Sequence, residues 1–182
     1  MSAVYVFSGP CGCGKTTLSN AYARHLVDEC GKLQAYVIHG DDFHAGFAET
    51  NAPVGSDCPQ FLYWADILKF NWECILSVAD KALTRNLDVV IDYVVEDELP
   101  LLEELARRHQ ARLFYVVLTA SEEELIQRLT KRGSTDLIDR SLFLKSKLDG
   151  LAGSHLYDIS GMTVEEEISR LEIERFEIVL EP

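Results

Sequence analysis

The segment from Gly9 to Thr16, Gly-Pro-Cys-Gly-Cys-Gly-Lys-Thr, is the part of the sequence that decides the fold. It matches the phosphate-binding pattern G-x-x-x-x-G-K-[ST] at every fixed position, and a chance match in a chain of this length has a probability on the order of one per cent. A short apolar run from Ala3 to Phe7 precedes it, and helical periodicity follows it. The sequence therefore predicts a loop that holds nucleotide phosphates between a first strand and a first helix.

The residue types in this loop suit the chemistry of triphosphate binding. Glycines allow the backbone N–H groups to curve around phosphate oxygens, and the N-terminus of the following helix adds a positive dipole end. We expect Lys15 to reach the β- and γ-phosphates, Thr16 to hold Mg²⁺ and Thr17 to lie near the α-phosphate. The residues expected to bind ATP are Gly9, Cys11, Gly12, Cys13, Gly14, Lys15, Thr16, Thr17 and Arg128.

The two cysteines of the loop, Cys11 and Cys13, are small residues at variable positions of the pattern. A redox or metal-binding role is the alternative, but a C-x-C pair by itself is a weak metal signal. A helix N-terminus lowers the pKa of a nearby thiol, so we expect these thiols to react with alkylating reagents.

The rest of the chain alternates short strands with helical patterns. Two N-terminal capping boxes are expected at Ser121 with Glu124 and at Thr163 with Glu166, and a helix over residues 136–150 is expected to end at Gly150. Residues 175–180 could form either an edge strand or a tail helix. The expected strands are Ala3–Phe7, Ala35–His39, Asp88–Asp92, Arg112–Leu118 and His155–Ile159. This alternation predicts an α/β fold of three layers, in which helices cover both faces of a five-stranded parallel sheet.

Length and composition indicate one globular domain over residues 1–182. Hydrophobic residues make up 47% of the 182, and 17 Lys and Arg face 30 Asp and Glu, for a formal net charge of -13. Such a charge disfavours binding to nucleic acid or to an anionic membrane. The sequence has no apolar stretch of the roughly 20 residues that span a bilayer and no apparent targeting segment. The five scattered cysteines suit a reducing compartment, so a cytoplasmic location is expected.

Carboxylates follow the second expected strand in the run from His39 to His44, His-Gly-Asp-Asp-Phe-His. The carboxyl ends of parallel strands border the ligand crevice, so a carboxylate there can take the proton of an acceptor hydroxyl. Asp41 is the first candidate for this base and Asp42 the second. The alternative is that one of them caps the next helix.

Asp92 ends the third expected strand. A carboxylate in that position after a phosphate-binding loop commonly lies near Mg²⁺ or its waters, and we assign Asp92 and Thr16 to the metal. Asp92 could equally bind the acceptor, and many strands end in Asp for reasons of turn geometry.

A basic cluster in this acidic chain predicts a lid over residues 128–150. Arg128, Lys131, Arg132 and Arg140 lie in it, and Arg128 and Arg132 share one helix face. Positive groups that close over a phosphoryl group stabilise its charge, so we expect these two arginines to be catalytic. The alternative is a solvated face with Glu124 and Arg128 paired. Residues 158–163, including Met162, are expected near the nucleotide base.

With these motifs the chain resembles the small P-loop kinases related to gluconate kinase, shikimate kinase and chloramphenicol phosphotransferase, from Gly9 to Asp158. The resemblance implies a parallel sheet with the strand of the phosphate loop in the middle and ATP as donor. It supports Lys15 and Thr16 on phosphate and magnesium, Asp41 on the acceptor side, and Arg128 and Arg132 in the lid. The Tyr-Val-Val that follows Asp92 departs from the triple glycine of shikimate kinases.

The sequence thus predicts an ATP- and Mg²⁺-dependent phosphotransferase that acts on a hydroxyl of a small molecule. One alternative is a non-catalytic or regulatory nucleotide-binding protein, in which Asp41 and Asp42 are dispensable. Another is a kinase acting on a nucleic-acid end, which the net charge makes unlikely. A group of aromatic residues either lines an acceptor pocket or belongs to the core. These residues are Phe43, Phe47, Phe61, Tyr63 and Trp64.

Overall fold

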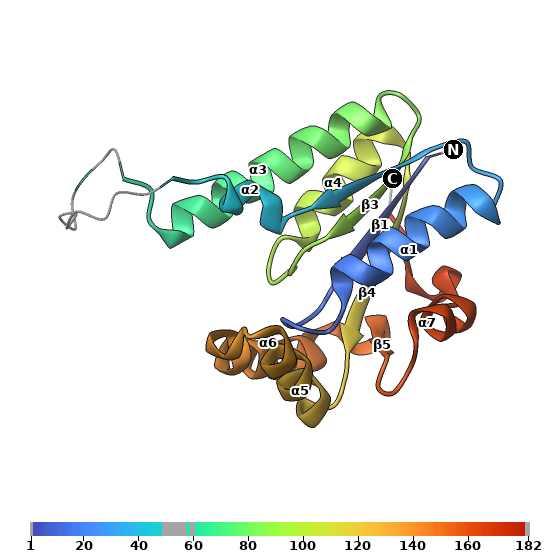
Figure 1. Cartoon of the computed structure of the whole chain (residues 1–182). Coiled ribbons are helices and arrows are strands. Elements are labelled where there is room, and N and C mark those ends of the chain that lie inside the picture. Colours follow the sequence, from blue (N-terminus) through green and yellow to red (C-terminus); the bar gives the residue numbers. More distant parts are fainter. Residues whose placement is uncertain (1, 49–57, 59–60, 181–182) are drawn as a thin grey trace.

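A mostly parallel sheet lies at the centre of the computed structural model, which describes residues 2–48, 58 and 61–180 (Figure 1). Its strands follow the order β2 (Ala35–His39), β3 (Asp88–Asp92), β1 (Ala3–Ser8), β4 (Arg112–Thr119) and β5 (Leu156–Asp158), with every neighbouring pair parallel. The strand that leads into the phosphate loop is therefore the middle one. The predicted α/β fold and its five parallel strands are confirmed.

The C-terminal segment adds one strand that the sequence left undecided. After a 3₁₀ turn over Ile173–Phe176, β6 (Glu177–Ile178) pairs antiparallel with Leu113 and Phe114 of β4. Arg112 fixes this segment, because its guanidinium donates to Glu177 at 2.7 Å and also pairs with Glu174.

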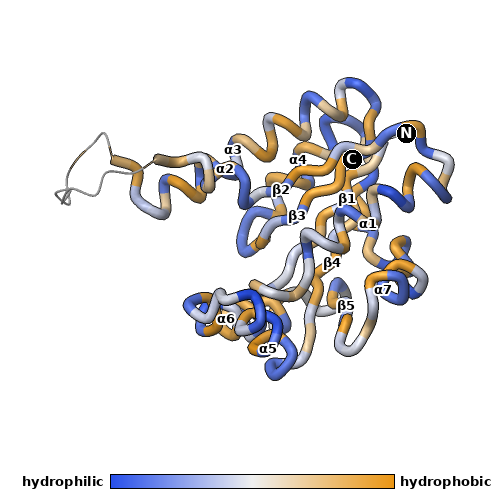
Figure 2. The backbone as a smooth tube through the Cα atoms, viewed as in Figure 1, coloured by the Kyte–Doolittle hydropathy of each residue, from blue (hydrophilic) through white to orange (hydrophobic). Residues whose placement is uncertain are grey.

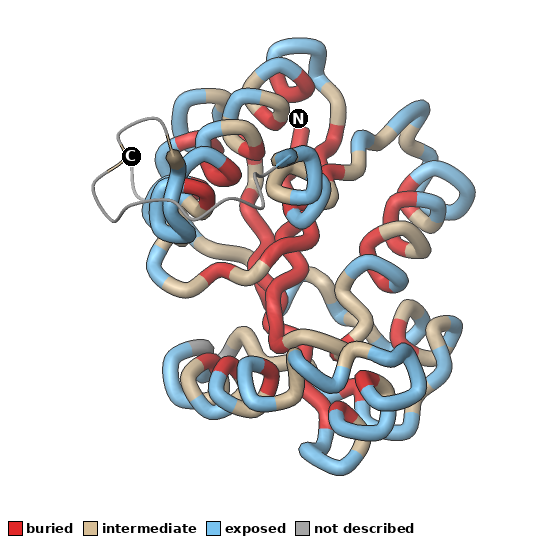
Figure 3. Tube along the Cα trace, turned by 60° about the vertical axis from the view of Figure 1, so that its left-hand side comes forward, coloured by how far each residue is buried: buried red, intermediate tan, exposed pale blue. Residues whose placement is uncertain are grey.

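Helices cover both faces of the sheet, as Figure 1 shows. In Figure 3 the buried stretches of chain run through the middle of the molecule, and the helices are buried along one side only. The helices are α1 (Lys15–Asp28), α2 (Asp41–Ala45), α3 (Trp64–Leu83), α4 (Leu99–His109), α5 (Glu122–Arg132), α6 (Ile138–Ala152) and α7 (Val164–Arg170), with 3₁₀ turns at Thr135–Leu137 and Gly153–His155.

Alternate residues of the central strand β1 pack into two hydrophobic cores, one on each face of the sheet. Val4 and Val6 pack with α3, α4 and α6, whereas Tyr5 and Phe7 pack with α1 and α5. This explains why β1 is apolar at consecutive positions, since a strand that is covered on both faces buries every side chain. Figure 2 shows the same property as hydrophobic colour along the strands.

Two helix ends differ from the sequence prediction. The expected helix over residues 136–150 begins with the 3₁₀ turn and continues past Gly150 to Ala152, and Gly153, with φ +48°, follows it. The capping box of α7 is present in full at Thr163 and Glu166. At α5 the Ser121 hydroxyl accepts from the Glu124 N–H at 3.2 Å, but the Glu124 carboxylate bonds elsewhere, so only half of that box forms.

Among the described residues no helix is both long and apolar enough to cross a membrane.

Candidate active site

A pocket of about 670 Å³ opens where the phosphate loop meets α2, α5 and α7. It lies beyond the carboxyl end of β1, where open parallel sheets bind their ligands. Nine of the residues singled out from the sequence line it: Cys11, Gly12, Gly14, Lys15, Thr16, Thr17, Asp41, Arg128 and Arg132. Gly9, Cys13, Asp42 and Asp92, which the sequence also singled out, are not in this lining.

The loop is shaped by a glycine that packs against a neighbouring strand. Gly9 has φ +137°, and a Cβ at this position would overlap the backbone oxygen of Leu118 and come within 2.9 Å of the Cys13 sulfur. Within this loop the Lys15 ammonium donates to the backbone oxygens of Gly9 at 2.9 Å and Pro10 at 3.0 Å. Lys15 therefore lies at the loop with its charge held close to where a phosphate would bind.

The two cysteines of the loop differ in exposure. Cys11 is half-buried and lines the pocket, whereas Cys13 is fully buried in the core beneath α1. Burial raises the pKa of the Cys13 thiol, which corrects the expectation that the helix N-terminus would lower it. Cys13 faces the site only through its backbone, whose carbonyl accepts from Arg128 at 3.3 Å.

Asp92 lies directly beneath the loop. Its carboxylate is 3% exposed, bonds to the Thr16 hydroxyl, and accepts from His39 at 2.7 Å. Burial raises its pKa, and the bonds from Thr16 and His39 oppose that shift. His39 thus positions Asp92, a contact that the sequence did not predict.

The two carboxylates after β2 occupy different places. Both are exposed on α2, and Asp41 lines the pocket while Asp42 does not. Neither has a hydrogen bond or ion pair with another described residue. Beside them, Gly40 packs against the Tyr93 ring, and the amide of buried Asn71 donates to the Tyr93 hydroxyl at 3.1 Å and bonds His44 at 2.9 Å. Contacts from α3 and from the end of β3 therefore support α2.

The aromatic residues near this end are only partly in the core. Tyr63 is 39% exposed and Trp64 is 59% exposed, which contradicts the core interpretation for these two. Phe43 packs against the core, Phe47 contacts Phe70 edge-to-face, and Phe61 contacts Tyr63 in the same way. None of these five residues is among the described residues that line the pocket.

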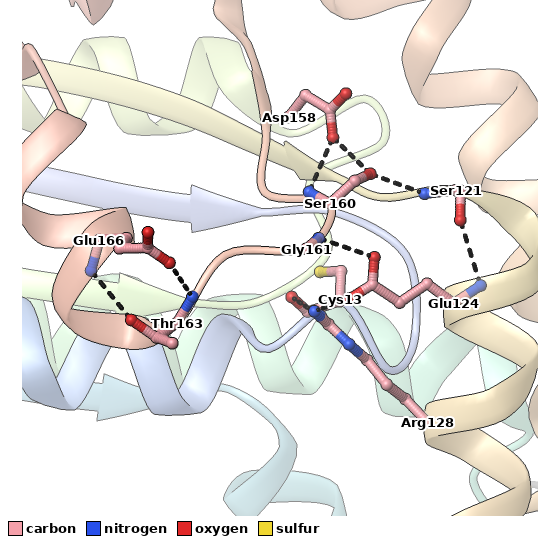
Figure 4. A network of polar contacts seen from close by, with 9 residues as sticks. All are labelled: Cys13, Ser121, Glu124, Arg128, Asp158, Ser160, Gly161, Thr163 and Glu166. Atoms are coloured by element: carbon pink, nitrogen blue, oxygen red, sulfur yellow. Dashed lines mark hydrogen bonds and ion pairs between the residues drawn. The ribbon is translucent and has the colours of Figure 1, made fainter.

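Arg128 connects α5 to the phosphate loop, as Figure 4 shows. Its guanidinium donates to the Glu124 carboxylate at 2.6 Å and to the Cys13 carbonyl at 3.3 Å. The other oxygen of Glu124 accepts from the Gly161 N–H at 3.2 Å. The ion pair between Glu124 and Arg128 therefore does not lie on a solvated helix face, as the alternative prediction had it. It fixes Arg128 against the loop and joins α5 to the segment after β5.

The other basic residues of the region are placed differently. Arg132 lines the pocket and donates to Ser134 at 3.1 Å, and Lys131 is exposed. Arg140 and Lys147 of α6 both pair with Glu96, the latter at 2.9 Å. Ser141 of α6 donates to the Cys11 carbonyl at 2.7 Å, so the region 128–150 contacts the phosphate loop at more than one point.

The far wall of the pocket comes from the segment after β5. Met162, which the sequence placed near the base, lines it together with Thr163, Val164, Glu165 and Glu167. Glu167, which is 5% exposed, was not predicted from the sequence. Its signal was its position: it lies three residues after Val164 and four before Leu171, on the helix stripe where an apolar residue is expected.

A known protein family matches most of the chain. The AAA_33 family, described as an AAA domain, matches residues 4–149, which run from β1 into α6. The chain belongs to this family of P-loop kinase domains. The resemblance to small P-loop kinases is thereby confirmed.

Two solved structures share the fold of this P-loop kinase domain over nearly its whole length. A tunicamycin resistance protein from Deinococcus radiodurans has a TM-score of 0.63 at 14% identity, covering 95% of this chain and 97% of its own. A gluconokinase from Sinorhizobium meliloti 1021 has a TM-score of 0.56 at 18% identity, covering 96% and 89%. At this identity the likeness establishes the fold alone.

The chain is also similar in sequence to curated guanylate kinases. A guanylate kinase from Geobacter metallireducens is 25% identical over 158 residues, which are 82% of this chain and 73% of the relative.

The site fits ATP with magnesium on its own geometry. The loop offers curved backbone beside a lysine, and Thr16 and Asp92 offer two oxygen donors in contact. Within the described ranges no group of three or more His, Cys, Asp or Glu could hold a metal ion. Mg²⁺ needs no such cage, because it is usually bound by one or two protein oxygens together with phosphate oxygens and water.

Proposed function

We propose that this P-loop kinase domain transfers the γ-phosphate of Mg²⁺-ATP to a hydroxyl of a small molecule. One observation carries the proposal: the phosphate loop, two arginines and Asp41 line a single pocket. A protein that only bound nucleotide would need the loop and the arginines. A carboxylate that opens into the same pocket from α2 supplies the group that a transferase also needs.

On the donor side each residue has a distinct task. Lys15 and the backbone of residues 9–16 bind the phosphates, and Arg128 and Arg132 stabilise the negative charge of the phosphoryl group in transfer. Thr16, positioned by Asp92, would hold magnesium, which neutralises charge on the β- and γ-phosphate oxygens when bound. Asp92 in turn is oriented by His39 at 2.7 Å.

On the acceptor side Asp41 is the proposed base. Its carboxylate takes the proton of the acceptor hydroxyl, the hydroxyl oxygen bonds to the γ-phosphorus, and the bond to the β–γ bridging oxygen breaks to release ADP. Asp41 takes precedence over Asp42 because Asp41 alone of the two lines the pocket.

The charge of the acceptor side bears on what the acceptor is. The name of the guanylate kinase relative suggests a nucleotide acceptor. In this chain, however, residues 33–68 contain no Lys or Arg. Asp41 lines the pocket, Asp42 lies beside it in the sequence, and neither forms an ion pair among the described residues. Arg140 and Lys147 are already paired with Glu96. Unpaired carboxylates repel a phosphorylated or carboxylated acceptor, so we propose a neutral or cationic alcohol.

Release of ADP from Mg²⁺-ATP tests this proposal. The acceptors to compare are neutral nucleosides and phenicol-like alcohols, cationic aminoglycosides, anionic sugar acids, and GMP. We expect stimulation by a neutral or cationic alcohol, lost in Lys15→Ala and retained in Lys81→Ala, which removes an exposed lysine of α3 outside the pocket. Stimulation by GMP alone would assign a nucleotide acceptor. Tight ATP binding with no stimulation by any compound would favour the regulatory alternative.

A further inference from the structure

Three buried carboxylates in the described part of the chain differ in their partners. Asp88 bonds to Lys32 at 2.7 Å and to the Ala3 N–H at 2.9 Å. Asp92 bonds to His39 and Thr16. The Glu167 carboxyl has no hydrogen bond or ion pair with any described residue, although the residue is 5% exposed. A buried carboxyl without a partner is costly unless something else satisfies it.

Glu167 is placed where a ligand could satisfy it. It belongs to the pocket lining, and α7, which carries it, packs against α1, the helix that follows the phosphate loop. Tyr157 donates to the Glu167 backbone carbonyl at 2.7 Å, which fixes the helix at this residue. The fold therefore fixes the backbone at this residue of the pocket lining.

The sheet order indicates which part of the nucleotide reaches this wall. The phosphate loop follows the middle strand β1, Asp41 follows the edge strand β2, and the segment of Glu167 follows β5 at the opposite edge. A triphosphate held over β1 with its γ-phosphate toward Asp41 must extend its base toward β5. There the apolar side chains of Met162 and Val164 and the planar guanidinium of Arg128 line the same pocket. Such groups suit the faces of an aromatic ring.

We propose that Glu167 reads the base of the donor nucleotide, by hydrogen bonding to the Watson–Crick edge of a purine. The inference rests on the proposed function and adds the residue that sets donor specificity. A protonated carboxyl donates to N1 of adenine and accepts from its 6-amino group. An ionised carboxylate only accepts, and its two oxygens match the N1–H and 2-amino donors of guanine.

The surroundings of Glu167 allow its carboxyl to be either protonated or ionised near neutral pH. Burial raises the pKa of its carboxyl to about 7, Arg128 lowers it, and Glu124 and Glu165 raise it further. From α1 the charged group in the pocket is Lys15, whose ammonium is bonded to the loop carbonyls. The preference for the donor should therefore move from adenine toward guanine as the pH rises from 6 to 8.

The test measures binding of Mg²⁺ complexes of the non-hydrolysable ATP and GTP analogues by calorimetry at pH 6 and pH 8. The readout is the ratio of the two affinities, because both ligands carry the same triphosphate and its titration cancels. In the unmodified protein we expect the preference for the adenine analogue to fall at least about tenfold between these pH values. Glu167→Gln, an isosteric neutral side chain, should abolish this pH dependence.

Controls separate base reading from folding and from phosphate binding. Glu123→Gln, an exposed residue of α5, removes the same charge and should behave like the unmodified protein. Glu167→Leu should weaken the adenine analogue at pH 6 at least about tenfold and leave binding of inorganic tripolyphosphate unchanged. A pH-dependent ratio that persists in Glu167→Gln overturns the inference while the proposed function stands. Failure of the unmodified protein to bind nucleotide or tripolyphosphate overturns both.

Discussion

The donor side and the acceptor side of the pocket are built in different ways. On the donor side Gly9 packs against the backbone of Leu118, and Arg128 is bonded both to Glu124 and to the loop carbonyl of Cys13. On the acceptor side Asp41 and Asp42 are exposed and have no partner among the described residues. Contacts from distant parts of the chain thus fix the part that binds phosphate. The carboxylates that would meet the acceptor are held by far fewer contacts. A change of acceptor therefore need not disturb the phosphate loop.

The largest expected effect concerns the acceptor side. Asp41→Asn should lower phosphoryl transfer about 10²–10⁴-fold, because an amide cannot take the hydroxyl proton. ATP affinity and thermal stability should change little, since Asp41 has no partner to lose among the described residues. Asp42→Asn is the matched control, and its loss of rate should be much smaller. Steady-state rates with the best acceptor and calorimetric ATP binding measure both. Equal losses in the two variants would refute the assignment of the base.

The two tryptophans of α3 offer a direct comparison of stability. Trp72 is 4% exposed in the core beneath the sheet, and Trp64, at the acceptor end, is 59% exposed. Trp72→Ala should cost about 3–5 kcal/mol of unfolding free energy, whereas Trp64→Ala should stay within about 0.5 kcal/mol. Urea unfolding followed by far-UV circular dichroism measures the two changes. A comparable loss in Trp64→Ala would show that the acceptor end is more firmly packed than this account holds.

Alanine substitutions at two glycines compare how tightly the backbone is packed on the donor side and on the acceptor side. Gly9→Ala combines a left-handed φ of +137° with overlap at Leu118, and should cost about 2–4 kcal/mol. Gly40→Ala keeps an ordinary φ of -62° and overlaps only the Tyr93 ring, so it should cost about 1–2 kcal/mol. Thermal unfolding of both variants ranks them. The reverse order would mean that the loop adapts more easily than the acceptor-side helix.

The last comparison concerns a pH-dependent gain on the donor side. Because the folded state raises the pKa of Glu167 from 4.5 to about 7, it retains a proton that the unfolded chain has lost. Stability contributed by this group therefore falls as the pH rises through this interval. Glu167→Gln should be more stable than the unmodified protein by about 1–3 kcal/mol at pH 8 and by less than about 1 kcal/mol near pH 5. Urea unfolding at both pH values tests this, with Glu123→Gln as control. A gain that is equal at the two pH values contradicts the raised pKa.

Local patterns in the sequence predicted the fold well. The bounds of β2 and β3 and the capping box of α7 agree with the structure, because each depends on a run of a few adjacent residues. The end of α6 was predicted wrongly at Gly150. The helix continues to Ala152, and the backbone turns to a positive φ only at Gly153, with φ +48°.

The site could be predicted only in part. The loop residues and both arginines were recognised from spacing, and the structure brings both arginines and all the loop residues except Gly9 and Cys13 into one pocket. The contact of His39 with Asp92 joins residues 53 positions apart, and no local pattern encodes it. Glu167 was missed because a run of three glutamates after Thr163 is typical of the first turn of a helix, and only packing shows that the third is buried.

The central claim is that the γ-phosphate passes from ATP in this pocket to a hydroxyl. Phosphorus NMR of the product, formed from Mg²⁺-ATP and the acceptor that stimulates ADP release, tests it most directly. The account predicts the resonance of a phosphate monoester on the acceptor, absent when Lys15→Ala or Asp41→Asn replaces the unmodified protein. A new nucleoside diphosphate resonance from a monophosphate acceptor, or inorganic phosphate as the sole product, would contradict it.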